Sequence, residues 1–120
     1  MKTARSLTLT DELLRAYSRR GNFHSEPEEA RQIGLPGLVA QGMQVAGPAY
    51  GMALDAWGGD FLARGVIELK FIGMVTGDQT VDATVDIDDD MHDDGTTATV
   101  TVTNRDTGAV AVVGSMRRTG

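Results

Sequence analysis

A histidine with polar neighbours on both sides could carry acid–base chemistry. His24 lies in the stretch GNFHSEPEEA, with Asn22 two residues before it and Glu26 two residues after it. An imidazole has an ordinary pKa of about 6.5 and exchanges protons near neutral pH, and a nearby carboxylate can act as a second acid or base. Asn22 could orient a water molecule. Alternatively, His24 is a loop histidine that only supports the start of the next helix.

A second candidate group lies where a long apolar helix is expected to begin. Gln41, Gly42 and Met43 stand at this point. The first amides of a helix have no intrahelical partner, so they can bind an oxygen that gains negative charge, and glycine permits close approach. The alternative is that these are only helix-start and core residues. Tyr50, further along the helix, could line the path of a bound ligand or belong to the core or a subunit interface.

Two short helices are expected to hold the histidine between them. Thr10 can cap the first of these helices, and Gly21 can end it. Ser25 can cap the second helix, with Pro27 in its first turn and Gly34 closing it. These signals place His24 directly before a helix cap.

The long apolar helix is predicted from the spacing of its hydrophobic residues. Those residues are Val39, Met43, Ala46, Tyr50, Leu54 (or Ala53) and Trp57. Their recurrence every three or four positions indicates one helix that is largely buried. Pro48 is expected to kink this helix or to leave its first turns irregular.

The second half of the chain has the two-residue period of strands. From about Arg64 onward, apolar side chains alternate with polar ones in four segments joined by short turns, and TARSLTLT near the N-terminus could add an edge strand. One apolar helix followed by an antiparallel sheet implies a single α+β domain over residues 1–120. The sheet should curl round the helix, as in a hot-dog fold.

Composition excludes several classes of protein. The 120 residues include no cysteine and carry a net charge of -6, so disulfides, thiolate chemistry and phosphate-rich nucleic-acid partners are not expected. The N-terminus lacks a signal-peptide core, and glycines and polar residues interrupt the most apolar segment, which predicts a cytoplasmic protein with no membrane partner. Arg19 and Arg20 could contact a cofactor phosphate, although a pair at a helix end more often interacts with the helix dipole.

The acidic stretch DIDDDMHDDG contains the other histidine, His92. A calcium loop of the EF-hand type needs a glycine at its sixth position and a bidentate acid at its end, and neither falls correctly here. We therefore expect an exposed acidic hairpin, with neither a metal nor another cofactor.

Four motifs, in order, resemble the MaoC-like, R-specific enoyl-thioester hydratase family. They are YS at 17–18, HSEPEEA at 24–30, GLVAQGM at 37–43 and FIGMVTGDQTV at 71–81. The resemblance covers nearly the whole chain. It implies a hot-dog domain that forms side-by-side homodimers and adds water to an enoyl thioester of coenzyme A or acyl carrier protein, or removes it. His24 would be the acid–base residue, and amides near Gly42 would bind the thioester oxygen.

The chain departs from the family's catalytic motif, Asp-x-Asn-Pro-x-His. With its histidine aligned on His24, the aspartate position holds Arg19 and the asparagine position holds Gly21. A one-residue gap places Asn22 on the asparagine but Arg20 on the aspartate. An alternative function is therefore a non-catalytic acyl-binding or assembly subunit of the same fold. A hot-dog thioesterase is a further alternative, but its helix would need a carboxylate, and only Asp55 is present, at the far end.

Overall fold

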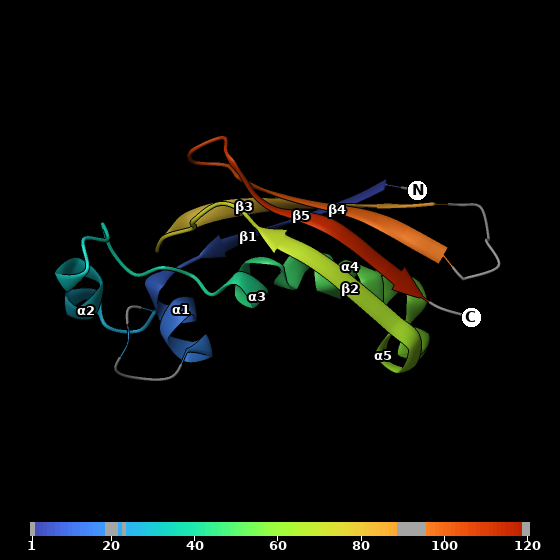
Figure 1. Cartoon of the computed structure of the whole chain (residues 1–120), viewed down its shortest axis with the longest axis horizontal. Helices are drawn as coiled ribbons and strands as arrows, with labels where there is room; N and C mark the ends of the chain where they lie inside the picture. Colours follow the sequence, from blue (N-terminus) through green and yellow to red (C-terminus); the bar gives the residue numbers. More distant parts are fainter. Residues whose placement is uncertain (1, 19–21, 23, 89–95, 119–120) are drawn as a thin grey trace.

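Five antiparallel strands form one curved sheet in the computed structural model, which describes residues 2–18, 22, 24–88 and 96–118 (Figure 1). The strand order is β1-β3-β4-β5-β2, so β1 and β2 are the two edges. The α+β prediction and the N-terminal edge strand are confirmed. The strands are β1 (Lys2–Leu9), β2 (Gly65–Phe71), β3 (Gln79–Ile87), β4 (Thr96–Asn104) and β5 (Val110–Arg118).

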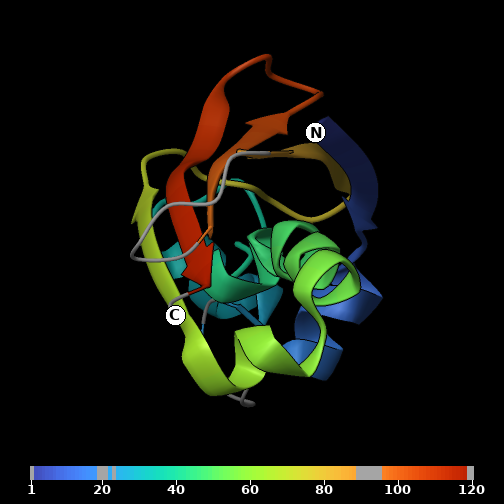
Figure 2. The ribbon, with the colours of Figure 1, turned by 90° about the vertical axis from the view of Figure 1, so that its right-hand side faces the viewer.

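The helices lie on one face of this sheet. They are α1 (Asp11–Tyr17), α2 (Pro27–Gln32), α3 (Gly42–Val45), α4 (Gly47–Trp57) and α5 (Gly59–Arg64). Figure 2 shows α4 inside the curve of the sheet, with β1 on one side of it and β2 on the other. Helices α1 and α2 gather at one end of the elongated molecule, whose extents are 50 × 28 × 19 Å.

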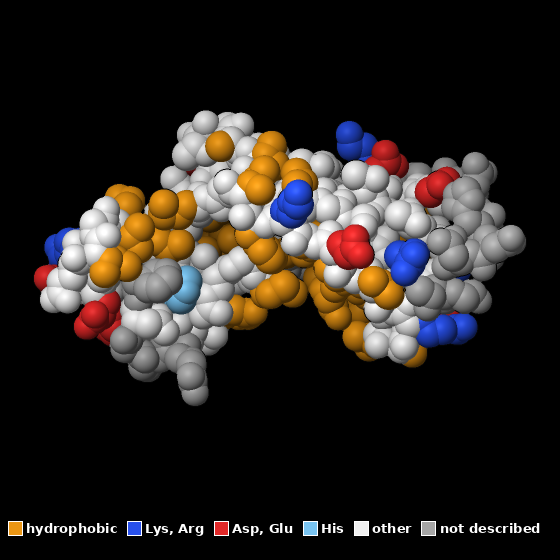
Figure 3. All heavy atoms as spheres, viewed as in Figure 1, with side chains coloured by type: hydrophobic (Ala, Val, Ile, Leu, Met, Phe, Trp, Pro, Cys, Tyr) orange, Lys and Arg blue, Asp and Glu red, His pale blue; other side chains and the backbone are white. Residues whose placement is uncertain are grey.

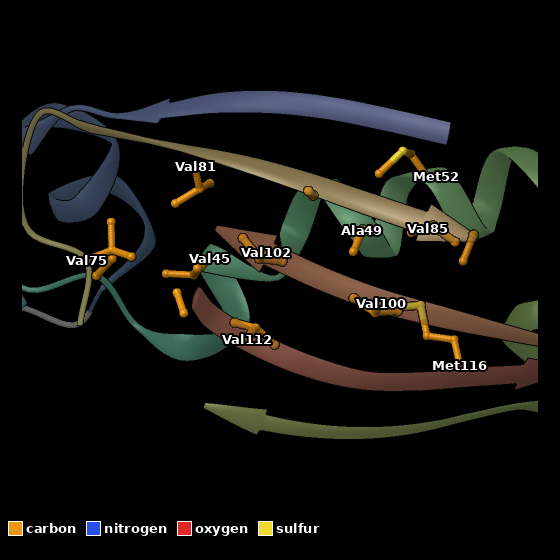
Figure 4. Packing of buried hydrophobic residues seen from close by; sticks show 14 of the residues in the cluster. Val45, Ala49, Met52, Val75, Val81, Val85, Val100, Val102, Val112 and Met116 are labelled. Atoms are coloured by element: carbon orange, nitrogen blue, oxygen red, sulfur yellow. The ribbon is translucent and has the colours of Figure 1, made fainter. Parts of the chain in front are cut away.

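The core lies between α3, α4 and the concave face of the sheet (Figure 4). Alternation in β3 and β4 turns valines and alanines inward and threonines and aspartates outward, as the two-residue period predicts. The side chains of Val81, Val85, Val100, Val102 and Met116 are at most 1% exposed. The strands that follow the helices in sequence therefore cover them in space.

The long central helix is interrupted near the predicted proline. Helix α3 ends at Val45, and α4 begins at Gly47, with Pro48 in its first turn. The inclusion of Val39 in the helical spacing was wrong, because Val39 pairs with Thr76 in an isolated β-bridge, whereas helical structure begins at Gly42, where the free amides were expected. A proline has no N–H to donate, so it fits the first turn of a new helix better than the interior of a continuous one.

The predicted buried stripe of this helix is confirmed only in part. Ala46 and Ala53 are buried as predicted, whereas Met43 is 48% exposed, and Tyr50, Leu54 and Trp57 are only partly buried. The other buried side chains of the two helices are Val45, Ala49 and Met52. The helix is apolar on two neighbouring stripes, and its small alanines permit the closest approach of the sheet, which spacing alone does not reveal.

The ends of the short helices follow their sequence signals in part. Thr10 caps α1, because its hydroxyl accepts a hydrogen bond from the Leu13 amide at 3.2 Å. Gly34 follows α2 with φ of 85° in a Schellman motif, in which the Leu35 amide donates to the Ala30 carbonyl at 3.0 Å. Helix α1 ends at Tyr17, and Gly21 lies outside the described residues.

Ser25 does not cap α2, contrary to the prediction. The cap is Glu26, which makes no side-chain hydrogen bond to the helix. Ser25 is fully buried, and its hydroxyl lies 3.4 Å from the Asn22 carbonyl. The serine hydroxyl therefore stabilises the loop before the helix and not the helix itself.

Helix α5 was not predicted. Gly58 ends α4 with φ of 60°, and Gly59 begins the next helix. Two adjacent glycines suggest a break in regular structure, but here the break is a single residue. An ion pair of 3.1 Å between Asp60 and Arg64 spans one turn of the new helix.

Candidate functional site

The loop between α1 and α2 carries the predicted acid–base histidine. Within it, the Asn22 side-chain oxygen accepts a hydrogen bond of 2.8 Å from the His24 backbone amide and one of 3.2 Å from the Ser18 hydroxyl. The Asn22 carbonyl accepts the Glu26 amide at 2.8 Å. These bonds fix the backbone on both sides of His24. Asn22 and Glu26 therefore lie in one turn with the histidine, as their spacing predicts.

Helix α1 anchors the same loop. The Arg15 Nε donates to the Ser25 carbonyl at 3.2 Å. The buried Ser25 hydroxyl also lies 3.4 Å from the Asn22 amide. A buried hydroxyl with partners on the facing backbone resists displacement, because leaving those groups unpaired would cost about 1–3 kcal/mol. The turn that carries His24 is thus held in place by several hydrogen bonds.

The half-buried imidazole of His24 points at the segment that leads into α3. Its Nδ1 lies 2.5 Å from the Val39 carbonyl oxygen. A carbonyl oxygen can only accept, so in the neutral ring Nδ1 carries the proton. The lone pair is then on Nε2. This is the tautomer that a general base needs if Nε2 is to face a substrate.

The segment around Val39 is itself pinned to the loop before β3. The Ala40 amide donates to the Val75 carbonyl at 2.8 Å, and the Gly77 amide donates to the Leu38 carbonyl at 2.9 Å. Leu38 and Ala40 are buried on either side of half-buried Val39. The carbonyl that holds His24 is therefore part of a short two-stranded pairing.

Helix α3 begins three residues after Val39, at Gly42. The Gln41 carbonyl accepts from the Gln44 and Val45 amides at 3.0 and 3.1 Å. Within the described part of the chain, no backbone hydrogen bond uses the amides of Gly42 or Met43. These are the orphan donors expected in a first helical turn. The Val39 carbonyl that contacts His24 and the two amides thus lie on the same short segment.

The ring of Phe71, at the end of β2, covers Gly42. A Cβ built on Gly42 would lie 2.7 Å from Phe71 Cδ1 and 2.8 Å from Cε1. Ordinary carbon contacts are about 3.5–4.0 Å, so only glycine fits beneath this ring without movement. The glycine expected to permit close approach does so, and the atoms that approach it in the structure belong to an aromatic side chain.

The other predicted substrate-binding residues extend away from this point. Met43 is 48% exposed beside Gly42, whereas Gln41 is half-buried as the cap of α3. Tyr50 lies two turns further on, where its ring meets Phe61 edge-on at 5.3 Å between centroids. Gln41, Gly42 and Met43 therefore follow closely on the Val39 carbonyl that contacts His24, and Tyr50 lies further along, in α4.

Apolar side chains line a hollow beneath the β2 edge. Figure 3 shows hydrophobic side chains gathered there, between the end formed by α1 and α2 and the end formed by α5. Half-exposed Phe71 and Met43 and partly buried Leu69 and Tyr50 belong to the elements around it. An apolar surface that leads from a polar corner is suited to an acyl chain with a polar head.

Among the described residues, one carboxylic acid, Asp82 on β3, has a strongly lowered pKa, and it lies far from His24 in the sequence. The Asp82 carboxylate accepts hydrogen bonds from Arg105 and from the Ser6 hydroxyl, which lower its pKa from 3.8 to about 2. Its partners are on β1 and in the turn after β4. This cluster joins β1, β3 and the turn after β4, and none of its members is hydrogen-bonded to His24 in an interaction that the described residues show.

Asp55, the carboxylate that a thioesterase would need, is also engaged elsewhere. It pairs with Arg5 of β1 at 2.6 Å.

The described residues contain no group of three or more potential metal ligands, and most of the acidic stretch with His92 lies outside them. No described helix has the length and apolar character required to cross a membrane. Arg19 and Arg20 also lie outside the described residues.

A family model, described as MaoC like domain, matches residues 1–110. The chain belongs to the MaoC-like domain family. No curated protein matches this MaoC-like domain significantly. The four ordered motifs in the sequence predicted this family, and the family assignment is confirmed.

Solved structures give the same fold. The "(R)-hydratase from A. caviae involved in PHA biosynthesis" has a TM-score of 0.78 and 19% identity, covering 98% of this chain and 93% of its own. A truncated HadBC (3R-hydroxyacyl-ACP dehydratase) complex from Mycobacterium tuberculosis has a TM-score of 0.72 and 19% identity, covering 100% and 95%. The ChsH1-ChsH2 complex from the same organism has a TM-score of 0.73 and 13% identity, covering 97% and 93%. The hot-dog prediction is confirmed.

Two features of the site were not assigned from the sequence. The Val39 carbonyl could not be identified from residue types, because every residue has a backbone carbonyl. Phe71 was placed only in an alternating strand, and its contact with Gly42 joins positions 29 residues apart. Val39 and Phe71 both lie in motifs that resemble the family, GLVAQGM at 37–43 and FIGMVTGDQTV at 71–81, and these motifs were the available signal.

Proposed function

We propose that this MaoC-like domain hydrates enoyl thioesters of coenzyme A or acyl carrier protein, or dehydrates the corresponding 3-hydroxyacyl thioesters. The observation that supports this most directly is the 2.5 Å contact between His24 Nδ1 and the Val39 carbonyl. It holds an imidazole with its basic nitrogen on the far side of the ring. The Val39 carbonyl that contacts the ring lies three residues before Gly42, and no backbone hydrogen bond among the described residues uses the amides of Gly42 and Met43. The family assignment agrees with this function.

In the hydration direction, His24 Nε2 removes a proton from water as the water oxygen bonds to Cβ. The electron pair of the double bond moves toward Cα and the thioester oxygen. The amides of Gly42 and Met43 stabilise the negative charge on that oxygen. The imidazolium then returns its proton to Cα, which restores the neutral base and completes the addition.

The neighbouring polar residues have supporting roles in this proposal. Asn22 holds the His24 backbone amide at 2.8 Å and could orient the attacking water through the rest of its carboxamide. Glu26 is the nearest carboxylate in sequence and could deliver the second proton in place of the imidazole. Gln41, Met43 and Tyr50 would line the path of the acyl chain.

The proposed oligomer is a homodimer. Strand β2 forms one edge of the sheet, and its side chains at Val66 and Phe71 are 38% and 49% exposed. An exposed apolar edge strand favours pairing with another strand. We propose no metal, nucleic-acid or membrane partner, and cytoplasmic localisation remains a prediction from the sequence.

The second candidate is a non-catalytic acyl-binding or assembly subunit. It is favoured by the motif itself, since Asn22 is a carboxamide whose oxygen is occupied by Ser18 and the His24 amide. No aspartate stands at the family position. Two of the similar structures are complexes of two named subunits.

A spectrophotometric assay with short and medium enoyl-CoA substrates tests the proposal. His24→Ala should lower kcat/KM by about 10²–10⁴-fold, the usual contribution of a positioned acid–base group. His92→Ala is the matched control, because it removes the other histidine, and it should leave the rate unchanged. Equal turnover in the wild type and in His24→Ala would contradict the role of His24.

Two further measurements separate the candidates. Asn22→Asp introduces a carboxylate beside the histidine, and an increase in kcat would show that the missing acid limits the rate. Binding of acyl-CoA by calorimetry, with no turnover in any variant, would favour the assembly subunit. Circular dichroism of each variant checks that the fold is retained.

A further inference from the structure

A short ribbon of two extended segments lies in contact with His24. One segment is 38–40, and the other is 75–77, in the loop before β3. Two backbone hydrogen bonds of 2.8 and 2.9 Å join the segments, one on each side of Val39 and Thr76. These two residues stand opposite each other between the bonds, so they form a non-hydrogen-bonded pair.

The kind of pair decides where the backbone groups point. In antiparallel pairing, the residues of a non-hydrogen-bonded pair direct their own N–H and C=O groups away from each other. The Val39 carbonyl therefore points out of one edge of the ribbon, where the imidazole of His24 meets it at 2.5 Å. The amide and carbonyl of Thr76 point out of the opposite edge.

Gln79, the first residue of β3, occupies that opposite edge. Its side-chain Oε1 accepts a hydrogen bond of 2.9 Å from the Thr76 amide, and its backbone amide donates to the Thr76 carbonyl at 3.2 Å. One residue thus binds both backbone groups that Thr76 directs outward, as a third strand would. The ribbon is therefore bonded to His24 on one edge and to Gln79 on the other.

Asn104, the last residue of β4, fixes the side chain of Gln79. It is 1% exposed, and its side-chain amide donates to Gln79 Oε1 at 2.8 Å. Its side-chain oxygen accepts the Asp106 amide at 3.0 Å, in the turn that follows β4. Because the turn uses the oxygen, the NH2 group of Asn104 must face Gln79. A buried carboxamide bonded at both ends has one orientation.

We infer that Gln79 and Asn104 are positioning residues for His24. They hold the Thr76 edge of the ribbon, and the other edge supplies the carbonyl that determines which ring nitrogen carries the proton. The inference rests on the acid–base role proposed above for His24. Neither residue contacts the substrate in this arrangement, since both act through Thr76 and Val39.

The ribbon needs such support because it is short. It contains one isolated bridge and lies outside the five-stranded sheet. An isolated pair of strands is marginally stable at best in water. The position of the Val39 carbonyl therefore depends on the contacts at both edges of the ribbon. Without the acceptor from Gln79, the ribbon should shift, and the carbonyl should move relative to the imidazole.

The tautomer of His24 reports this arrangement without any substrate. While the Val39 carbonyl is in place, Nδ1 carries the proton, because a carbonyl oxygen can only accept. When the carbonyl moves away, the contact no longer favours that tautomer, and both become populated. 15N NMR of the imidazole distinguishes a nitrogen with a proton from one without. The chain has two histidines, so His92→Ala assigns the signals of His24.

Gln79→Met and Gln79→Glu are the matched test variants. Both side-chain bonds of Gln79 are accepted by its oxygen. A glutamate retains that acceptor, whereas a methionine of similar length offers only a weakly accepting sulfur. At about pH 8.5, where an ordinary imidazole is neutral, the wild type and Gln79→Glu should show His24 protonated on Nδ1. Gln79→Met should show a mixture of the two tautomers.

Asn104→Asp tests the same network from its other end. It keeps an oxygen for the turn but removes the donor to Gln79. Two oxygens then face each other unless the Gln79 carboxamide turns over, and in that case the Thr76 amide loses its acceptor. The tautomer mixture of Gln79→Met should therefore recur. Asp82→Asn, on the outer face of the same strand, is the control for lost stability and should leave the His24 signals unchanged.

The enoyl-CoA assay provides a second readout. A shift of about 1 Å in a catalytic group can lower the rate about 10²-fold. Gln79→Met should accordingly lower kcat about ten- to a hundredfold and change KM less than about twofold, because it alters the base and not the acyl contacts. Gln79→Glu should restore kcat to within about twofold of the wild type.

The outcomes separate this inference from the proposed reaction. A wild type protonated on Nε2 would overturn the inference, as would wild-type tautomers in both Gln79→Met and Asn104→Asp or a mixture in Gln79→Glu. These results would hold whatever the enzyme assay gives. A protein with the expected tautomer changes that hydrates no enoyl-CoA would support the positioning and refute only the hydratase function.

Discussion

Replacing Gly42 by alanine tests whether the contact with Phe71 positions the start of α3. The added Cβ would lie 2.7 Å from Phe71 Cδ1, about 1 Å closer than an ordinary carbon contact of roughly 3.7 Å. Either the ring or the first turn of α3 must move by that amount. Overpacking of this kind costs about 1–3 kcal/mol. We expect about 1 kcal/mol, because the ring is half-exposed and can move outward.

The same displacement should reduce activity more than stability. A shift of about 1 Å in a group that positions the substrate can lower the rate about 10²-fold. Gly42→Ala should therefore lower kcat/KM by about ten- to a hundredfold in the enoyl-CoA assay. The melting temperature should fall by only about 3–6 °C in thermal unfolding. Gly47→Ala is the matched control, because a Cβ there meets nothing within 4 Å.

A double-mutant cycle with Phe71→Ala assigns the cause. If the ring is the obstacle, Gly42→Ala should cost little stability in a Phe71→Ala background. The coupling energy should then be about 1 kcal/mol, above the roughly 0.5 kcal/mol expected for independent sites. Additive losses would refute the reasoning, as would a Gly42→Ala protein with wild-type activity and melting temperature.

Three other variants test the fold. Asp82→Asn should destabilise the protein at neutral pH. Since the folded pKa lies below 3.8, the Asp82 contribution is present above that value and is lost as pH falls through about 2, so the difference in melting temperature from wild type should shrink over that interval. Leu14→Ala removes a fully buried side chain and should cost about 2–5 kcal/mol by urea unfolding, whereas Leu13→Ala, at a 41% exposed neighbour, should cost far less. Thr10→Ala removes the cap of α1 and should cost about 1 kcal/mol in the same measurement.

The sheet was predictable from sequence because one rule governs every strand. Apolar and polar residues alternate in β3 and β4, which are neighbours in the sheet. The pairing order did not follow from the alternation, because β2 pairs with β5 and not with β3, the next strand in the chain. The central helix was harder. Its sequence is apolar on adjacent stripes, so the stripe that contains Met43 and Tyr50 could not be distinguished from the buried one at Ala49 and Met52.

The site was predictable only to the level of its segments. His24 and Gly42 were identified from residue type and motif order, and the structure connects their segments through a backbone carbonyl. The Ser25 prediction failed because a serine before an acidic helix start has two uses, capping the helix or bracing the loop. Which use prevails depends on Asn22 and Arg15, which contact the serine only after folding.

The bond between His24 and Val39 also bears on how the ring would behave during a turnover. Both nitrogens of an imidazolium are donors, so the bond from Nδ1 to the carbonyl survives when Nε2 gains a proton. The ring can therefore accept and release a proton with the same anchor and the same orientation. No side-chain rotation is required between the two half-reactions, and the loop that carries the ring has no need to move.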